Sequence, residues 1–157
     1  MDIAKTLNKD EALDTLIAEI ETFDEKYLNE CINALNYIRY EKVLDWIEHN
    51  AHKAINISSN WGHVAASSCF NWNRADKWLT KGRPLSLIAL DALIFCTTID
   101  ERLNQSLWMR EIQPTLTDNP KPEIVANRLQ KYLQVDNVPR TRDAVKKIIN
   151  NLFEVEL

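Results

Sequence analysis

Residues 85–96, LSLIALDALIFC, constrain the fold most, because they are apolar nearly all round and carry one charge, Asp91. A helix without a polar face must be surrounded by other structure. Gly82 and Pro84 precede it, and glycine at the end of one helix with proline at the start of the next is the asymmetry typical of helix termini. We therefore expect a central buried helix that follows a separate short helix.

The rest of the chain shows helical periodicity and no convincing strand. Only two glycines occur in 157 residues, which leaves few positions for the positive φ angles of hairpins and bulges. The prediction is a single all-α domain over 1–157 with about eight or nine helices. The segments with helical spacing of apolar residues are 8–23, 25–50 (as two helices meeting near 36–40), 61–72, 74–80, 101–112, 122–133 and 138–153.

Three short segments resemble one another: LDWI at 44–47, DKWL at 76–79 and QKYL at 130–133. Each is followed by a second helix in which a small residue permits close approach of a neighbour and a bulky residue one turn later fills the gap. Because one helix pair cannot bury its apolar face alone, we expect antiparallel pairs that stack. The small and bulky positions are Ala66 and Phe70, Ala89 and Leu93, and Ala144 and Ile148.

The segments GRPLSLIALDAL and VPRTRDAVKKII resemble the second-helix signature of HEAT repeats. The resemblance covers about residues 40–154, with a degenerate N-terminal pair as a cap, and it implies a right-handed superhelix of stacked antiparallel helix pairs. The usual aspartate between paired helices is not clear in this chain, and residues 48–59 are inserted into the first full repeat. A non-repeating helical bundle is the alternative fold.

The two parts of the chain differ in charge. Residues 1–50 carry 12 acidic and 5 basic side chains, whereas residues 51–157 carry 11 acidic and 14 basic ones. The acidic part favours a basic partner and the remainder a polyanion, unless both are simply solvated helix faces. Without a signal-peptide pattern or a membrane-length apolar run, we expect a cytoplasmic protein whose cysteines are buried free thiols. The cysteines are Cys31, Cys69 and Cys96.

No catalytic or metal site stands out. His49, His52 and His63, together with Cys69, carry donors suited to zinc, but their spacing matches no common zinc motif. His63 and Cys69 are six residues apart and would point to different sides of one helix, which argues against a thiol–imidazole pair. We therefore predict no metal, no cofactor and a protein suited to binding rather than to catalysis.

Trp61 and Trp72 are the main candidates for recognition. If 61–72 is one helix, the two fall on one stripe that flanks the core stripe, and with Asn60 they would line a groove. Tryptophans next to amide side chains are suited to bind a protein partner as a hot spot or to stack on a nucleic-acid base. The alternative is an ordinary contact between helices, because tryptophans are mostly well buried.

Basic residues gather near these tryptophans and along the last predicted helix. On stacked pairs they would share one inner face, and Arg140 and Arg142 near a helix N-terminus would be placed to hold phosphates. The predicted partner-binding residues are Asn60, Trp61, Trp72, Arg74, Lys77, Arg83, Arg140 and Arg142.

These features favour a non-catalytic protein-interaction module, an adaptor or an immunity-type binding protein, with a curved helical surface for a basic partner protein. As the alternative, the stretch from NWGHVAASS to WLTKGRPLSLIALDAL resembles HEAT-like DNA alkylation-repair glycosylases, which implies damaged duplex held against a basic concave face. The sequence departs from that pattern: no aspartate follows Trp61 at the expected catalytic place, and the paired arginines after Trp78 are missing.

Overall fold

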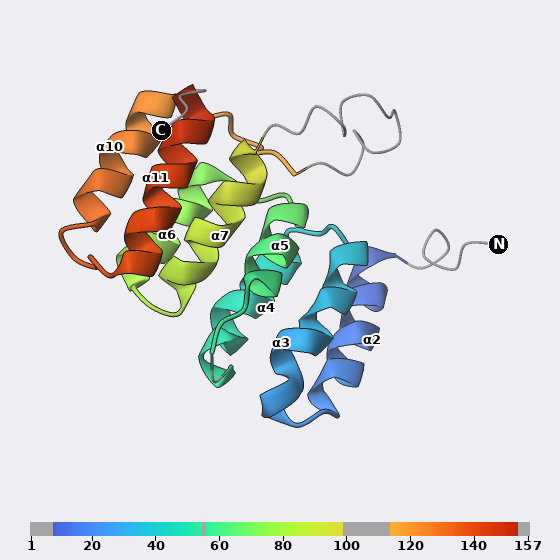
Figure 1. The fold of residues 1–157 in the computed structure, drawn as a ribbon. Helices are drawn as coiled ribbons and strands as arrows, with labels where there is room; N and C mark the ends of the chain where they lie inside the picture. Colours follow the sequence, from blue (N-terminus) through green and yellow to red (C-terminus); the bar gives the residue numbers. More distant parts are fainter. Residues whose placement is uncertain (1–7, 55, 99–113, 154–157) are drawn as a thin grey trace.

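The computed structural model describes residues 8–54, 56–98 and 114–153 (Figure 1). Within these ranges the chain has eight α-helices, three short 3-10 helices and no strand, which confirms the all-α prediction for them. The helix expected over 101–112 lies outside the described residues. The α-helices are α2 (Lys9–Glu21), α3 (Leu28–Cys31), α4 (Lys42–Asn50), α5 (Ser59–Ser67), α6 (Trp72–Lys81), α7 (Leu85–Thr97), α10 (Pro122–Tyr132) and α11 (Pro139–Phe153); the 3-10 helices are Glu25–Tyr27, Ile32–Tyr37 and Ala51–Lys53.

Most helix ends follow from local signals in the sequence. The side chain of Asn8 accepts a hydrogen bond of 2.7 Å from the backbone N–H of Glu11 and caps α2. Gly82 ends α6 at a φ of 77°, a conformation that glycine adopts without steric cost. Pro122 and Pro139 stand at the first positions of α10 and α11, where a missing N–H costs nothing.

The segment 61–72 is not one helix, contrary to the prediction. Helix α5 ends at Ser67, and Cys69 has a φ of 58°. The side chain of Asn71 then accepts a hydrogen bond of 2.8 Å from the N–H of Arg74 and starts α6. Trp61 and Trp72 therefore belong to different helices and do not share a stripe.

The break also changes which side chains are buried. Ser68 is fully buried and donates a hydrogen bond of 2.7 Å to the carbonyl oxygen of Val64. Cys69 is exposed, so the expectation of a buried thiol is wrong there, whereas Cys31 and Cys96 are half-buried. Burial raises the pKa of the Cys96 thiol to about 12.

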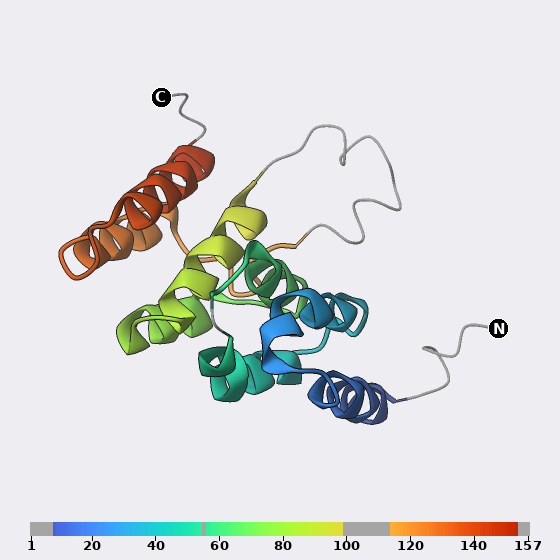
Figure 2. The same cartoon turned by 60° about the horizontal axis from the view of Figure 1, so that its bottom comes forward.

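Helix α7 lies at the centre of the fold, as its composition predicts. It contacts α6 before it in the chain, and it lies between α5 and α11 (Figures 1 and 2). Successive helices are also neighbours in two other places, because α4 contacts α5 and α10 contacts α11. The buried side chains of α7 are Leu85, Ser86, Ile88, Ala89, Leu90, Ala92 and Leu93.

The contact between α5 and α7 depends on Gly62. A Cβ atom at Gly62 would lie 2.3 Å from the Cβ of Asp91 and 3.0 Å from the backbone N of Ala92. These distances are too short for any side chain, so the glycine is what allows the two helix backbones to approach each other. No helix in the described residues is long and apolar enough to cross a membrane.

We predict that Gly62→Ala destabilises the protein, although alanine is the better helix former by about 1 kcal/mol. Forcing a methyl group into the α5–α7 contact costs about 1–3 kcal/mol of unfolding free energy, measurable by urea denaturation. In an Asp91→Gly background the loss from Gly62→Ala shrinks, because the nearest colliding atom is gone. An equally stable or more stable Gly62→Ala protein would contradict this close contact.

Candidate functional site

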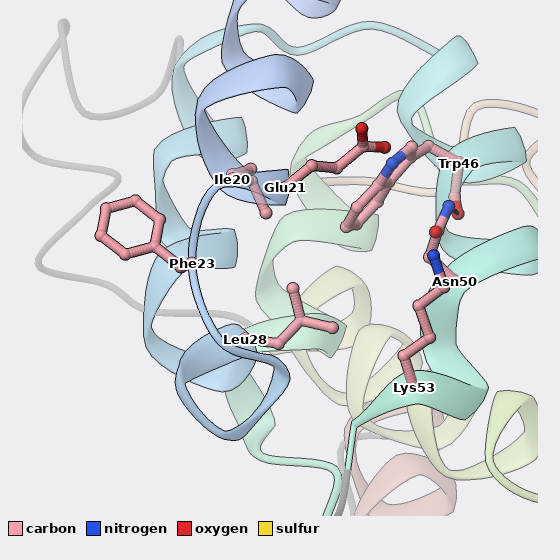
Figure 3. A pocket seen from close by; sticks show the side chains of 7 residues that line it. All are labelled: Ile20, Glu21, Phe23, Leu28, Trp46, Asn50 and Lys53. Atoms are coloured by element: carbon pink, nitrogen blue, oxygen red, sulfur yellow. Dashed lines mark hydrogen bonds between the residues drawn. The ribbon is translucent and has the colours of Figure 1, made fainter.

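A pocket with a volume of about 280 Å³ opens between the end of α2 and the helix α4 (Figure 3). Its apolar walls are Ile20, Leu28 and the indole ring of Trp46, and Lys53 lies at its edge. The pocket is thus mainly apolar, with a carboxylate, an amide and an ammonium group among its polar lining residues. The lining residues are Ile20, Glu21, Phe23, Leu28, Trp46, Asn50 and Lys53.

The chain beside this pocket exposes two aromatic rings in an acidic setting. The side chains of Phe23 and Tyr27 are 50% and 45% exposed, among the most exposed large apolar residues of the described chain. The exposed carboxylates of Glu21, Asp24 and Glu30 are near them in the sequence, and one ammonium group, Lys26 Nζ, lies 5.0 Å from the centre of the Tyr27 ring. We call the residues of these two rings and three carboxylates the acidic corner. Phe23 is among the residues that line the pocket, although its ring points away from Trp46 and Leu28 (Figure 3), and Tyr27 lies outside the lining. Exposed aromatic rings near a pocket are characteristic of recognition surfaces.

Trp61 is buried inside the protein, where it packs against another tryptophan. Its side chain has no exposed surface, and its ring stacks on Trp46 with centroids 6.0 Å apart and planes 10° from parallel. The indole N–H donates to the side-chain oxygen of Asn29 at 2.6 Å, and Asn60 donates to the Asn29 carbonyl at 2.9 Å. Trp72 is 8% exposed. Trp61 thus makes contacts between helices, the alternative given from the sequence, Trp72 is buried as well, and Trp46 lines the pocket.

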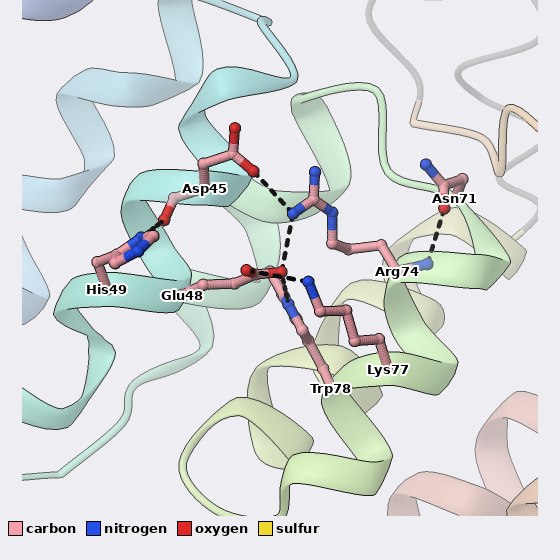
Figure 4. Close-up of polar contacts among 7 residues, drawn as sticks. All are labelled: Asp45, Glu48, His49, Asn71, Arg74, Lys77 and Trp78. Atoms are coloured by element: carbon pink, nitrogen blue, oxygen red, sulfur yellow. Dashed lines mark hydrogen bonds and ion pairs between the residues drawn. The ribbon is translucent and has the colours of Figure 1, made fainter.

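Arg74 and Lys77 belong to a network that joins α6 to α4 (Figure 4). Arg74 Nη1 lies 2.8 Å from Glu48 Oε1 and 2.9 Å from Asp45 Oδ1. Lys77 Nζ lies 3.4 Å from Glu48 Oε2, and the indole N–H of Trp78 donates to Glu48 Oε1 at 2.7 Å. Burial alone would raise the pKa of Glu48, but the bonds from Arg74 and Trp78 and the nearby positive charges lower it from 4.5 to about 2.

Two of the remaining predicted arginines are also paired within the chain. Arg83 makes a two-pronged pair with Asp136, at 2.8 and 2.7 Å. Arg140 Nη2 lies 3.2 Å from Asp91 Oδ2, which joins α11 to α7. Arg142 is exposed and forms no ion pair within the described ranges. The structure therefore does not gather the predicted cations into one free basic face.

Three cations at matching positions in the sequence each bond a carboxylate on an earlier helix. Sequence reasoning missed this pattern, which we call the repeated cation. Lys42 bonds Asp10 of α2 at 2.7 Å, Arg74 bonds Asp45 of α4 at 2.9 Å, and Arg128 bonds Asp76 of α6 at 2.6 Å. Each cation stands four residues before the aromatic of a matching segment, in KVLDW, RADKW and RLQKY. This spacing was visible in the sequence, but the acidic partners were not, because they lie on another helix.

The histidines make local contacts. His49 Nδ1 lies 2.7 Å from the carbonyl oxygen of Asp45 one turn earlier, and His63 meets Phe95 edge-on with centroids 5.0 Å apart. His52 is exposed. Among the residues that the structure describes, no three His, Cys, Asp or Glu side chains gather closely enough to hold a metal ion.

We predict that Arg74→Ala lowers the unfolding free energy by about 2 kcal/mol, since it leaves the carboxylate of Glu48 short of its closest charged donor. Lys77→Ala is the matched control, because Lys77 pairs with the same carboxylate but its side chain is 54% exposed. Its effect should stay below about 0.5 kcal/mol. Urea denaturation of both variants measures the difference, and equal losses would show that Arg74 is not the main partner.

The lowered pKa of Glu48 predicts a pH dependence of stability. A carboxyl group whose folded pKa is depressed stabilises the protein above its unfolded pKa near 4.5, and this contribution disappears as the pH falls toward 2. Wild-type protein should therefore lose more stability between pH 4.5 and 2 than Glu48→Gln, whose amide does not titrate. Urea midpoints across this range test it, and parallel curves for the two proteins would rule it out.

Comparisons with protein-family models, with curated proteins and with solved structures found no match.

Proposed function

We propose that the chain is a non-catalytic protein-interaction module that binds a basic segment of a partner protein at the acidic corner and the adjoining pocket. The observation that carries the proposal is the pair of exposed rings, Phe23 and Tyr27, beside an apolar pocket in the acidic part of the chain. Exposed aromatic residues provide apolar contact area, and surrounding carboxylates attract a partner of opposite charge.

The shape of the pocket supports a peptide-like occupant. A volume of about 280 Å³ is at the lower end for small-molecule sites and suits one large side chain. The stem of a partner's lysine or arginine would lie against Leu28 and the Trp46 ring, with its charge near Glu21. Asn50 and Lys53 would offer donors to backbone carbonyls of the same segment.

The proposal includes a HEAT-like stack of antiparallel helix pairs as the scaffold. The repeated cation supports it, because Lys42, Arg74 and Arg128 each tie the first helix of one pair to a helix of the preceding pair. Contacts of α7 with both α5 and α11 also fit second helices that stack in order. Free thiols at Cys31, Cys69 and Cys96 support a reducing, cytoplasmic setting.

The charges of the described part of the chain give the DNA-repair alternative little support, since only Arg142, Lys146 and Lys147 of α11 form a group of exposed cations without ion pairs there. Duplex binding needs several lysines and arginines free to reach phosphates. Arg74, Arg83, Arg128 and Arg140 instead bond carboxylates of the same chain. The carboxylate with the strongly lowered pKa, Glu48, is likewise occupied by Arg74 and Trp78 and is not placed to act as an acid or base.

Peptide selection on the intact protein tests the proposal. A random 12-residue peptide library displayed on phage is selected against wild-type protein, and the enriched sequences are synthesised. We expect a class of peptides rich in Lys or Arg with one bulky apolar residue. Their affinity should fall tenfold or more in Glu21→Lys/Phe23→Ser, about 1.4 kcal/mol or more, and should also fall with added salt.

Phe153→Ser provides the matched control, because Phe153 is 41% exposed but lies on α11. It should bind the same peptides with unchanged affinity. Selected peptides without basic character, or basic peptides indifferent to the corner substitutions, would overturn the proposed function. Circular dichroism establishes that each variant is folded.

A further inference from the structure

A second apolar groove runs between α10 and α11, with a volume of about 300 Å³. Leu133, Val145 and Ile149 form its apolar floor, and Arg142 and Lys146 stand along it. We call these five residues the α10–α11 groove. Both cations are exposed and form no ion pair within the described ranges, so their charge is available to a partner.

The repeated cation pattern stops at this end of the molecule. In α4 and α6, carboxylates one or two residues before the aromatic, Asp45 and Asp76, receive the cation of the following pair. The two corresponding positions before Tyr132 are Gln130 and Lys131. A further pair of the same kind would bring its cation to an amide and an ammonium group instead of a carboxylate. The end of α10 thus disfavours continuation of the stack and favours an acidic occupant.

Helix α11 strengthens this charge preference. It carries four basic residues and a single acidic one, Asp143. Arg140 is committed to Asp91, which leaves the others to set the charge of the outer surface. The basic residues are Arg140, Arg142, Lys146 and Lys147.

We infer that the α10–α11 groove is the docking site for the acidic corner of a second copy of this chain. The inference rests on the proposed function, because it names the partner of the acidic corner. The two surfaces are complementary: exposed rings at Phe23 and Tyr27 among carboxylates meet an apolar floor beside Arg142 and Lys146. Apolar contact provides the affinity, and the opposite charges set the register.

The two surfaces lie at opposite ends of the row of helices, with α2 and α3 at one end and α10 and α11 at the other (Figure 1). Different patches on the two copies make the contact heterologous, or head-to-tail. Each copy then keeps one unused surface after the first contact forms. The assembly therefore grows longer as the protein concentration rises, unless the copies close into a ring.

Sedimentation velocity on the whole chain measures this association. From about 5 to about 200 μM protein in about 50 mM NaCl, the weight-average sedimentation coefficient of the wild type should rise, and about 500 mM NaCl should make this rise smaller. The groove variant Arg142→Glu/Lys146→Glu and the corner variant Glu21→Lys/Phe23→Ser should each remain monomeric. Lys121→Glu and Phe153→Ser, substitutions at exposed positions outside both surfaces, should behave as wild type.

Mixing the two variants gives the decisive result. The groove variant keeps its acidic corner and the corner variant keeps its groove, so a 1:1 mixture can form a single interface. It should produce a dimer with one copy of each variant and nothing larger. If the charge reversals disturb folding by circular dichroism, Arg142→Gln/Lys146→Gln replaces the groove variant.

Three outcomes would overturn the inference: a wild type that is monomeric throughout, variants that associate as the wild type does, or a mixture without dimer. Failure here is distinguishable from failure of the proposed function. If the wild type stays monomeric while basic peptides still bind the acidic corner, the proposed function stands and a second copy is not the partner. If the peptides also fail to bind, both are wrong.

Discussion

The need to cover α7 on nearly every side governs the structure. Its apolar surface is too extensive for one neighbouring helix, and α5, α6 and α11 together enclose it. One of these contacts is very close, because Gly62 of α5 leaves no Cβ atom between its backbone and Asp91 of α7. Helices α2 and α3 attach to the rest of the fold through the 3-10 helix Ile32–Tyr37, which packs on α5, and the pocket lies between α2, α3 and α4.

Charge in this protein is divided between a structural and a surface role. Cations that bond carboxylates on other helices, such as Arg74 and Arg128, hold those helices together. They contribute little to the electrostatic potential at the molecular surface. Three cations of α11 (Arg142, Lys146 and Lys147) form no ion pair within the described ranges, and neither do the exposed carboxylates Glu19, Glu21 and Asp24 around the end of α2. The two ends of one chain therefore differ in sign, although the net charge is only −4.

The sequence was sufficient to predict the structural features that depend on residues close together along the chain. The buried α7, the Asn8 cap and the proline starts of α10 and α11 all follow from local patterns. The predictions that were wrong concern features that depend on residues far apart in the sequence. Trp72 begins a helix partly because both oxygens of Asp118 accept the N–H groups of Trp72 and Asn73, and no periodicity reveals a partner 46 positions away. The pocket likewise combines residues of α2 and α4, whose proximity only the fold shows.

Asn29 has a consequence for the inserted segment 48–59. Its side chain and backbone hold Ser58, Asn60 and Trp61 at the start of α5, and its amide also donates to the carbonyl of Asn56. The far end of the insertion is therefore anchored independently of the turn that leaves α4. Because the segment is held at both ends, a change in its length should be tolerated best between the buried residues Ala51 and Ile57, which would allow a short label to be inserted there.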